Sequence, residues 1–234
     1  MGVKIKMEKR INVEKIPESF KTKELGTGHN GTAYLTSDGK VYKEYHTEGI
    51  DDEVTDKLLD LDYEGFTFPK QLVIEKGKFK GFIKDYVEGV SLEDLDLDKT
   101  NVYDFLIALR KFEEELMELS YDTELDVYDL NLNNLVYTED KRIVDIDTDP
   151  MHPFTYPITN PYYENQKYLA ESLHNIFMNG EFKSLRLQQL QNEILVGGYM
   201  KPSKFIGEAL EKMDHYIDVE SISDYQKGLS LLRK

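Results

Sequence analysis

The sequence predicts an α+β fold in two lobes, in which a small antiparallel β-sheet with one helix precedes a mainly helical region. Two features of the chain lead to this prediction. Before about residue 90, short apolar runs alternate with glycine-containing and charged turns, which is typical of strands. After it, apolar residues recur mostly at helical spacing. We therefore expect an N-lobe over residues 1–88 and a C-lobe over residues 89–234.

The N-lobe is expected to contain short strands joined by hairpin turns. The strand segments, in order, read KELGTG, TAYLT, KVYKEY, QLVIEKG and FKGFIKDYV. SDGK at 37–40 and EKGK at 75–78 have the composition of turns between paired strands. One helix is expected over Ile50–Leu61, because its apolar residues share one stripe. The stripe consists of Ile50, Val54, Leu58 and Leu61.

Three helices are expected in the C-lobe, each marked by apolar residues at spacings of three and four. The first carries Val102, Phe105, Leu106, Leu109, Phe112 and Leu116; the second carries Tyr168, Leu169, Leu173, Ile176 and Phe177; the third carries Phe205, Ala209, Leu210, Met213 and Ile217. The exception is the segment 134–148, whose pattern predicts a hairpin that turns at Glu139-Asp140.

Composition limits the class of protein. With 234 residues, 40% of them hydrophobic, the chain can bury a core as one domain or two small lobes. No apolar run approaches the roughly 20 residues that span a bilayer, and the N-terminus lacks the apolar segment of a signal peptide. The absence of cysteine excludes disulfides and thiolate metal sites. We expect a cytoplasmic protein with no membrane partner.

The net charge of −16 argues against non-specific binding to nucleic acid, because an acidic surface would repel phosphates. It would favour encounter with cationic partners, either basic proteins or amine-bearing small molecules. The alternative interpretation is a solvated acidic surface that has no role in recognition.

Four motifs carry the chemistry, and their order matters more than any one of them. GTGHNG at 26–31 contains a full GxGxxG, with Gly26, Gly28 and Gly31. Lys43 follows on the third predicted strand, Asp129 and Asn134 form an Asp-x4-Asn, and Asp147 ends the predicted hairpin. A dinucleotide-binding fingerprint would need a helix directly after the glycines, and here a strand and a turn follow instead.

In this order and on these elements, the motifs resemble those of the protein-kinase-like superfamily, over roughly residues 20–180. IKDYVEGVSLEDL at 83–95 is similar to the segment that joins the two lobes in that family. There, a strand runs into an acidic-Tyr-Val stretch, and a Ser-Leu pair opens the next helix. Ser91 is the expected N-cap of that helix, with Asp94 as its capping partner.

The resemblance implies a role for each motif in binding ATP. Backbone N–H groups of the loop with Gly26, Gly28 and Gly31 would close over phosphate oxygens. Lys43 would hold the α- and β-phosphates and pair with a helix carboxylate, for which we choose Glu53, with Asp52 and Asp56 as competitors. The adenine would lie against the backbone of Asp85–Val87.

The resemblance also implies the catalytic and metal-binding residues. Asp129 would accept or orient the proton of the acceptor hydroxyl, while Asn134 and Asp147 would bind Mg²⁺ or Mn²⁺. Asp145 and Asp149 lie two residues to either side of Asp147 and would share its side of an extended strand. Either could be an additional metal ligand or have no such role.

Several departures from the family pattern narrow the function. Val127-Tyr128 replaces the usual His-Arg, Asn131 replaces a lysine, and Thr148-Asp149 replaces Phe-Gly. No Ala-Pro-Glu follows, so a regulated peptide platform is not expected. These features resemble minimal kinases, including small-molecule phosphotransferases of the aminoglycoside and choline kinase type, although the His-Gly-Asp of that group is also missing.

The sequence therefore predicts an ATP-dependent enzyme, a minimal atypical protein (Ser/Thr) kinase that transfers the γ-phosphate to a hydroxyl. The acceptor would be a protein or a small cationic hydroxyl-bearing molecule, and the family-like lobe connection slightly favours a protein. The alternatives are a small-molecule kinase, a pseudokinase that acts as a nucleotide-binding or interaction module, and an enzyme that transfers AMP in place of phosphate. No nucleic-acid partner is expected.

Overall fold

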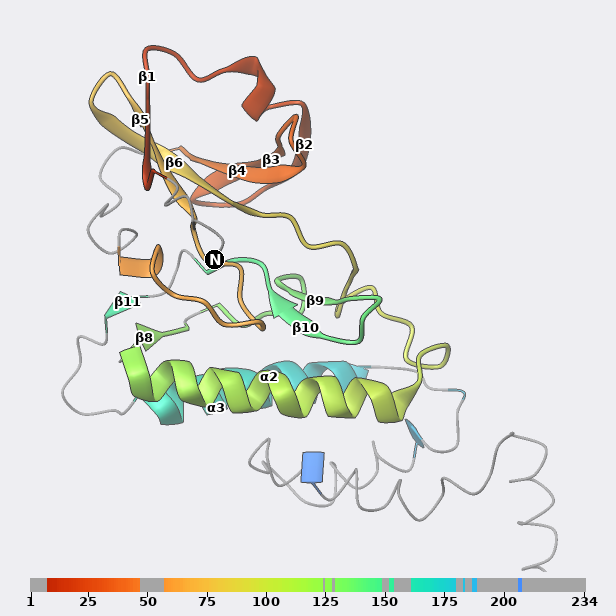
Figure 1. Cartoon of the computed structure of the whole chain (residues 1–234). Coiled ribbons are helices and arrows are strands. Elements are labelled where there is room, and N and C mark those ends of the chain that lie inside the picture. Colours follow the sequence, from red (N-terminus) through yellow and green to blue (C-terminus); the bar gives the residue numbers. More distant parts are fainter. Residues whose placement is uncertain are drawn as a thin grey trace, which may run out of the picture.

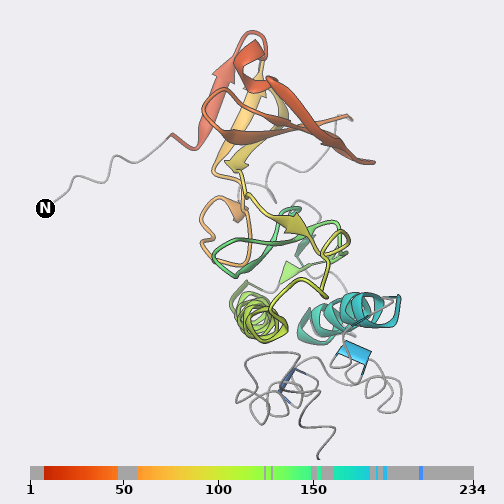
Figure 2. The same ribbon diagram turned by 90° about the vertical axis from the view of Figure 1, so that its right-hand side faces the viewer.

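The computed structural model describes residues 8–46, 57–123, 125–127, 129–148, 152–153, 161–179, 183, 187–188 and 206–207. It is a mixed α+β structure with a six-stranded sheet and two long helices, which confirms the predicted class. Figure 1 shows the sheet at one end of the molecule and the helices at the other, with a β-hairpin between them. Figure 2 shows the two helices nearly end-on and next to each other.

The six-stranded sheet has the strand order β1-β5-β6-β4-β3-β2. Its strands are β1 (Arg10–Val13), β2 (Lys23–Thr27), β3 (Gly31–Leu35), β4 (Lys40–Tyr45), β5 (Gln71–Glu75) and β6 (Lys78–Asp85), and a 3-10 turn, η1 (Glu18–Phe20), lies between β1 and β2. The five strands expected from the sequence are therefore confirmed. The sequence analysis missed β1, which adds to the sheet edge parallel to β5.

Both predicted hairpin turns of the sheet are confirmed. At 37–40, the N–H of Thr36 donates to the carbonyl of Lys40, and Gly39 has a φ of +80°. At 75–78, Lys76 and Gly77 have φ values of +50° and +77°, as a two-residue turn with both central residues in the left-handed region requires. Glycine tolerates this region because it has no Cβ.

The remaining strands are short and belong to the half of the chain after the sheet. β9 (Leu135–Tyr137) and β10 (Ile143–Asp145) form the predicted antiparallel hairpin, and β7 (Val90–Ser91) adds to β9. β8 (Leu125–Asp126) pairs with β11 (His152–Pro153). The connection between β9 and β10 includes Glu139 and Asp140, with Lys141 in the left-handed region at a φ of +63°.

The two long helices agree with the sequence pattern. α2 (Val102–Thr123) continues beyond the predicted Leu116, and α3 (Pro161–Asn179) covers the second predicted helix. Asn165 of α3 links the two, because its Nδ2 donates to Ser120 Oγ at 2.7 Å. Within the described part of the chain, neither helix is both long and apolar enough to cross a membrane.

The helix start predicted at Ser91 is wrong. Ser91 Oγ does accept the N–H of Asp94, but only a turn follows. Further along, Asp96 Oδ1 accepts the backbone N–H of Asp98. Hydrogen bonds from short acidic side chains to nearby backbone groups compete with helix formation. The helix begins at Val102, where Asn101 Oδ1 accepts N–H groups of its first turn.

Two predicted helices fall largely outside the described residues. Of the helix expected over Ile50–Leu61, only 57–58 are described as helical, and Leu61 lies beyond that helix. Leu58 is buried in the core below the sheet, as its place on the apolar stripe predicts. Of the helix expected around Phe205–Ile217, only 206–207 are described, and both are helical.

The largest apolar core lies between α2, α3 and the β9–β10 hairpin. It includes segments from both halves of the sequence, because Leu58, Phe66 and Phe68 pack in the same cluster as the buried face of α2. Smaller clusters cover the two faces of the sheet, one around Leu72 and Phe82 and the other around Tyr42, Val73 and Ile83. The division into an N-lobe over residues 1–88 and a C-lobe over residues 89–234 stays a prediction.

Candidate functional site

Lys43 and Asp147, predicted as site residues from distant motifs, form an ion pair. Lys43 Nζ lies 2.6 Å from Asp147 Oδ1, although 104 residues separate them. Lys43 lies on β4, and its neighbour Tyr42 is buried on the opposite face of the sheet. The two side chains are 11% and 28% exposed, so the pair is partly shielded but still reaches solvent. This ion pair therefore links the sheet to the segment that follows the β9–β10 hairpin.

The approach of β6 to β4 at Lys43 depends on a glycine that the sequence analysis missed. A Cβ at Gly81 would lie 1.9 Å from the carbonyl oxygen of Lys43, and Gly81 has a φ of +156°. Any other residue would push β6 away from β4 at this point. A lone glycine inside a strand run is a signal for such a close approach, and it is present in FKGFIKDYV.

The backbone before Asp147 is held from two sides. The N–H of Ile146 donates to the carbonyl of Asn134 at 2.8 Å, which brings the two predicted metal-binding residues close together. The N–H of Asp147 donates to Asp145 Oδ1 at 2.9 Å. From the sheet, Lys84 Nζ donates to the carbonyl of Ile146. The position of Asp147 is therefore set by the hairpin and by β6 together.

Asp145 is fully buried beneath Asp147 and does not share its access to solvent. The expectation that both share one side of the backbone assumed an extended strand, but β10 ends at Asp145 and the chain bends at Ile146. Burial is the main cause that raises the pKa of Asp145 to about 7, and the nearby Asp147 carboxylate adds to it. The carboxylate of Asp145 holds Asp147 in position by accepting its backbone N–H.

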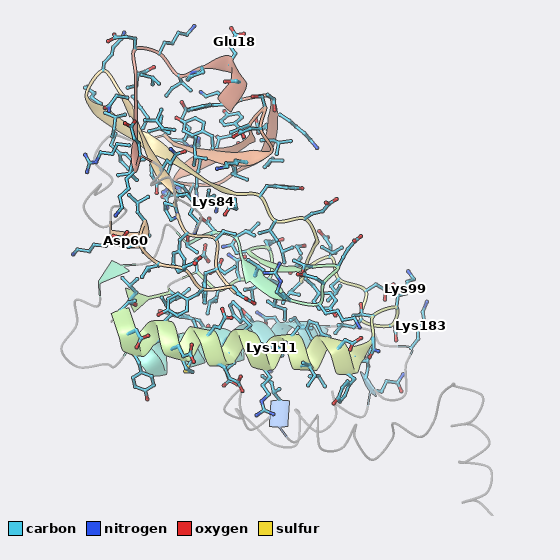
Figure 3. All side chains as sticks on the ribbon, in the orientation of Figure 1. Glu18, Asp60, Lys84, Lys99, Lys111 and Lys183 are labelled. Atoms are coloured by element: carbon cyan, nitrogen blue, oxygen red, sulfur yellow. The ribbon has the colours of Figure 1, made fainter. Side chains whose placement is uncertain are left out.

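Lys84 is a second residue that the sequence analysis missed. It is only 4% exposed, although it lies in the strand segment that leads to the predicted lobe connection. Figure 3 shows Lys84 where the sheet approaches the hairpin below it. Its positive charge lowers the pKa of Asp145 and offsets part of the effect of burial. A lysine within the apolar run GFIKDYV was the available signal.

The Asp-x4-Asn segment folds into a turn closed by its own side chains. Asp129 accepts from Asn131 Nδ2 at 2.8 Å and from Asn134 Nδ2 at 3.2 Å. Asn134 Nδ2 also donates to the Asp129 carbonyl at 3.0 Å. Asn131 Oδ1 in turn accepts the N–H groups of Asn133 and Asn134. The sequence thus contains both the carboxylate and the amides that orient it.

A metal ion would find few ligands here beyond the predicted pair. Since Asn134 Nδ2 faces acceptors at Asp129, its Oδ1 is the atom suited to a cation, as is the Asp147 carboxylate. Such hard oxygen ligands fit Mg²⁺ or Mn²⁺ and leave positions for phosphate and water. In the described ranges, no group of three or more His, Cys, Asp or Glu side chains is arranged to hold a metal.

The glycine segment forms the exposed turn between β2 and β3. The N–H of Gly28 donates to the carbonyl of Gly31 at 2.9 Å. A Cβ at Gly26 would meet nothing within 4 Å, and one at Gly28 would meet only Gly31 O, at 3.9 Å. At Gly31, a Cβ would lie 2.4 Å from the carbonyl oxygen of Glu44 on β4. Packing therefore requires glycine at Gly31, but it does not explain Gly26 and Gly28.

The predicted adenine segment directly follows the sheet. Asp85 ends β6 opposite Lys40 of β4, and its side chain is exposed. Val87 is half-buried in the connection to β7. Gly89 is tightly packed in that connection, because a Cβ there would lie 2.5 Å from the carbonyl oxygen of Tyr137. The chain therefore passes close to the β9–β10 hairpin on leaving the sheet.

One set of predicted residues lies outside the described part of the chain. Glu53, the chosen partner of Lys43, and its competitors Asp52 and Asp56 belong to this set, as does Asp149. The pairing of Lys43 with Glu53 stays a prediction. What the structure describes for Lys43 is the contact with Asp147.

A pocket of about 710 Å³ opens beside Asp129, on the side of the loop that faces α3. Its wall combines the loop with the segment after β7 and one face of α3. The sequence analysis did not predict it, because its walls come from three separate parts of the chain.

Comparison with known proteins identifies no family for this chain. No protein-family model matches the sequence, and a search of curated proteins finds no match. The resemblance to the protein-kinase-like superfamily therefore rests on the residues themselves, and it stays a prediction.

Proposed function

We propose that the chain is an ATP-dependent phosphotransferase with a two-lobed, protein-kinase-like fold, which transfers the γ-phosphate of ATP to a hydroxyl group. The contact between Lys43 and Asp147 is the observation that carries this proposal. A fully exposed ion pair would be weak support for a functional site, because many such pairs contribute nothing measurable to stability. This pair is partly shielded, joins the sheet to the segment after the hairpin, and consists of two residues predicted to act on one nucleotide.

On the sheet side, the glycine turn and Lys43 would bind the phosphates. A Cβ at Gly26 would meet nothing within 4 Å, and one at Gly28 would meet only a carbonyl oxygen, so this turn leaves room for a phosphate to approach its backbone closely. Lys43 supplies a fixed positive charge at the base of the sheet. Asp85 and Val87 would lie against the adenine through their backbone groups.

On the hairpin side, Asn134 and Asp147 would hold Mg²⁺, which would neutralise charge on the phosphates. Asp129 would orient the acceptor hydroxyl, since two amide groups already fix the direction of its carboxylate. Phosphoryl transfer needs mainly correct positioning and charge neutralisation, so a rigid arrangement of this kind suits it.

Calorimetric titration of ATP into the protein, with and without magnesium, tests the proposal directly. We expect binding that depends on magnesium and weakens by at least ~100-fold in Asp147→Asn, because that substitution removes the metal-binding charge. Asp62→Asn is the matched control, since the Asp62 side chain is 95% exposed and its ion-pair partner is Lys70. Its affinity for ATP should equal that of the unchanged protein.

The same protein is then incubated with ATP and candidate acceptors, and products are measured by mass. A gain of one phosphate supports the proposal, whereas a gain of a nucleotide identifies AMP transfer. Absence of ATP binding under every condition would contradict the proposal and leave an interaction module with a kinase-like arrangement of residues.

A further inference from the structure

The pocket beside Asp129 has walls from three elements that hydrogen bonds hold together. The N–H of Leu92 donates to the carbonyl of Leu135 at 2.8 Å, which fixes the segment after β7 against the hairpin. Ser172 Oγ of α3 donates to the carbonyl of Leu130 in the loop. Val127 N–H donates to Asn165 Oδ1 of the same helix at 2.8 Å. The pocket is therefore preformed, as small-molecule sites usually are.

Charge in the pocket has one sign. Among the described residues that line the pocket, the charged ones are Glu93, Asp129 and Glu171, and none of these is basic. Lys99, in the loop that follows Glu93, is paired with Asp96 at 2.6 Å. A cation that enters the pocket would therefore meet only carboxylates among the charged groups of its lining.

The rest of the lining is part apolar and part hydrogen-bonding. Apolar side chains come mainly from the segment after β7 and from the loop: Leu92, Leu95, Leu97, Leu130 and Leu132, with Ile176 from α3. Amide and hydroxyl groups come from the loop and from α3: Asn131, Asn133, Tyr168, Ser172 and Asn175. The α3 residues recur at spacings of three and four, so they share one face of the helix.

We propose that this pocket binds the phosphoryl acceptor, and that the acceptor is a small molecule with a protonated amine, a hydroxyl and an apolar portion. The proposal rests on the proposed function, because it places the acceptor hydroxyl at Asp129. A volume of about 710 Å³ falls within the range of small-molecule sites. The carboxylates match the amine, the leucines match the apolar portion, and the amides fit further polar groups.

The reaction at this pocket balances without any additional reagent. The hydroxyl oxygen bonds to the γ-phosphorus of ATP, and the bond from that phosphorus to the bridging oxygen breaks. ADP leaves, and the hydroxyl proton passes to Asp129 and then to water. The products are a phosphorylated amino alcohol, ADP and one proton.

A pair of probes tests the pocket without ATP. 4-(Aminomethyl)benzyl alcohol has an amine and a hydroxyl on an apolar ring, and 1,4-benzenedimethanol replaces the amine with a second hydroxyl. A titration monitored by ligand-observed NMR should show that the amine probe binds at least ~10-fold more tightly than the diol probe. A charge-assisted contact in a partly enclosed site would give a difference of this size. Equal binding of the two probes, or binding of neither, would overturn the proposal.

Substitutions in the lining test whether the preference for the amine probe arises in this pocket. Glu171→Gln and, separately, Glu93→Gln should reduce the preference for the amine to about threefold or less. Glu18→Gln is the matched control, because Glu18 is an exposed carboxylate at the far end of the sheet (Figure 3). If Glu18→Gln reduces the preference as much as Glu171→Gln does, the general acidity of the protein is responsible and the pocket is not.

Turnover separates this inference from the proposed function. With ATP and magnesium, the amine probe should accelerate ADP release and gain one phosphate, with a KM that rises about tenfold in Glu171→Gln while kcat stays within about twofold. If a serine peptide is phosphorylated and the amine probe is not, the phosphotransferase proposal stands and the acceptor proposal fails. If ATP does not bind but the amine is still preferred, the pocket stands and the phosphotransferase proposal fails.

Discussion

The two sides of the candidate site are built in opposite ways. The glycine turn between β2 and β3 is exposed from Gly26 to Asn30, and few backbone bonds hold it: the N–H of Gly28 donates to the carbonyl of Gly31, and the N–H of His46 donates to that of Asn30. The segments around Asp129 and Asp147 are tied by side-chain and backbone bonds to each other, to β6 and to α3. Substitutions at Gly26 and Gly28 can therefore change ligand binding alone, whereas a substitution at Gly31 or on the acidic side affects stability as well.

The difference has a physical cause. Under the proposed function, a turn that has to leave room for phosphates at its backbone would be held by few internal bonds. Neighbouring carboxylates repel each other. Hydrogen-bond donors around them are therefore needed to hold each one in a fixed direction. Here Asn131 and Asn134 donate to the carboxylate of Asp129, and Lys43 donates to that of Asp147.

The largest expected effect on the acidic side is that of Asp129→Asn. The substitution keeps the size of the side chain but removes the carboxylate that would orient the acceptor hydroxyl. We expect turnover to fall by ~10²–10⁴-fold, the usual contribution of a general base, while calorimetry shows an ATP affinity within about twofold. Unchanged phosphoryl transfer would show that Asp129 has no part in the chemistry.

Neighbouring asparagines sharpen the comparison further. Asn134 is half-buried and bonded to Asp129, whereas Asn133 is exposed. Asn134→Ala should weaken magnesium-dependent ATP binding by roughly 10–100-fold, the usual range for residues that support a metal site, and Asn133→Ala should leave it unchanged. Titration calorimetry on both variants provides the measurement. The reverse order would move the metal-binding role to Asn133.

Glycines of the exposed side should separate binding from stability. Gly31→Ala should lower the free energy of unfolding by about 1–3 kcal/mol, because its Cβ would overlap the carbonyl of Glu44. Gly26→Ala should change it by no more than about 0.5 kcal/mol but should weaken ATP binding. Urea unfolding and calorimetry measure the two effects. A similar loss of stability in both variants would show that the turn is not as open as the structure indicates.

The smallest expected effect concerns Glu115 of α2, which accepts the N–H of Gly65 at 2.6 Å. Burial raises the pKa of this carboxyl above its ordinary value of 4.5, so the folded protein holds the proton more tightly than the unfolded chain. Its contribution to stability is therefore present at low pH and is lost as the pH rises through the raised pKa.

Glu115→Gln keeps an acceptor oxygen for Gly65 and removes the titration. Urea unfolding at about pH 5 and about pH 7 should then show a smaller fall in stability with rising pH in the variant than in the unchanged protein. An identical fall in both proteins would contradict the raised pKa.

Much of the fold was predictable because its signals are local. Strand runs, turn residues and the apolar stripes of α2 and α3 lie within short windows, and the structure agrees with each of them. The errors arose where a partner distant in sequence decides the local structure. The edge strand Arg10–Val13 depends on pairing with β5, and the turn after Ser91 has the capping bonds of a helix start but no helix. In both cases the deciding partner lies outside the window.

By itself, the sequence determined which residues are candidates for chemistry: the glycine turn, Lys43, Asp129, Asn134 and Asp147, together with the elements that carry them. Only the tertiary structure decided that Lys43 reaches Asp147, that Asp145 and Lys84 are buried behind them, and that a pocket opens beside Asp129. Periodicity reports which face of an element is buried, but it does not report what that face meets. Contacts between residues 104 apart arise only when the sheet packs against the hairpin.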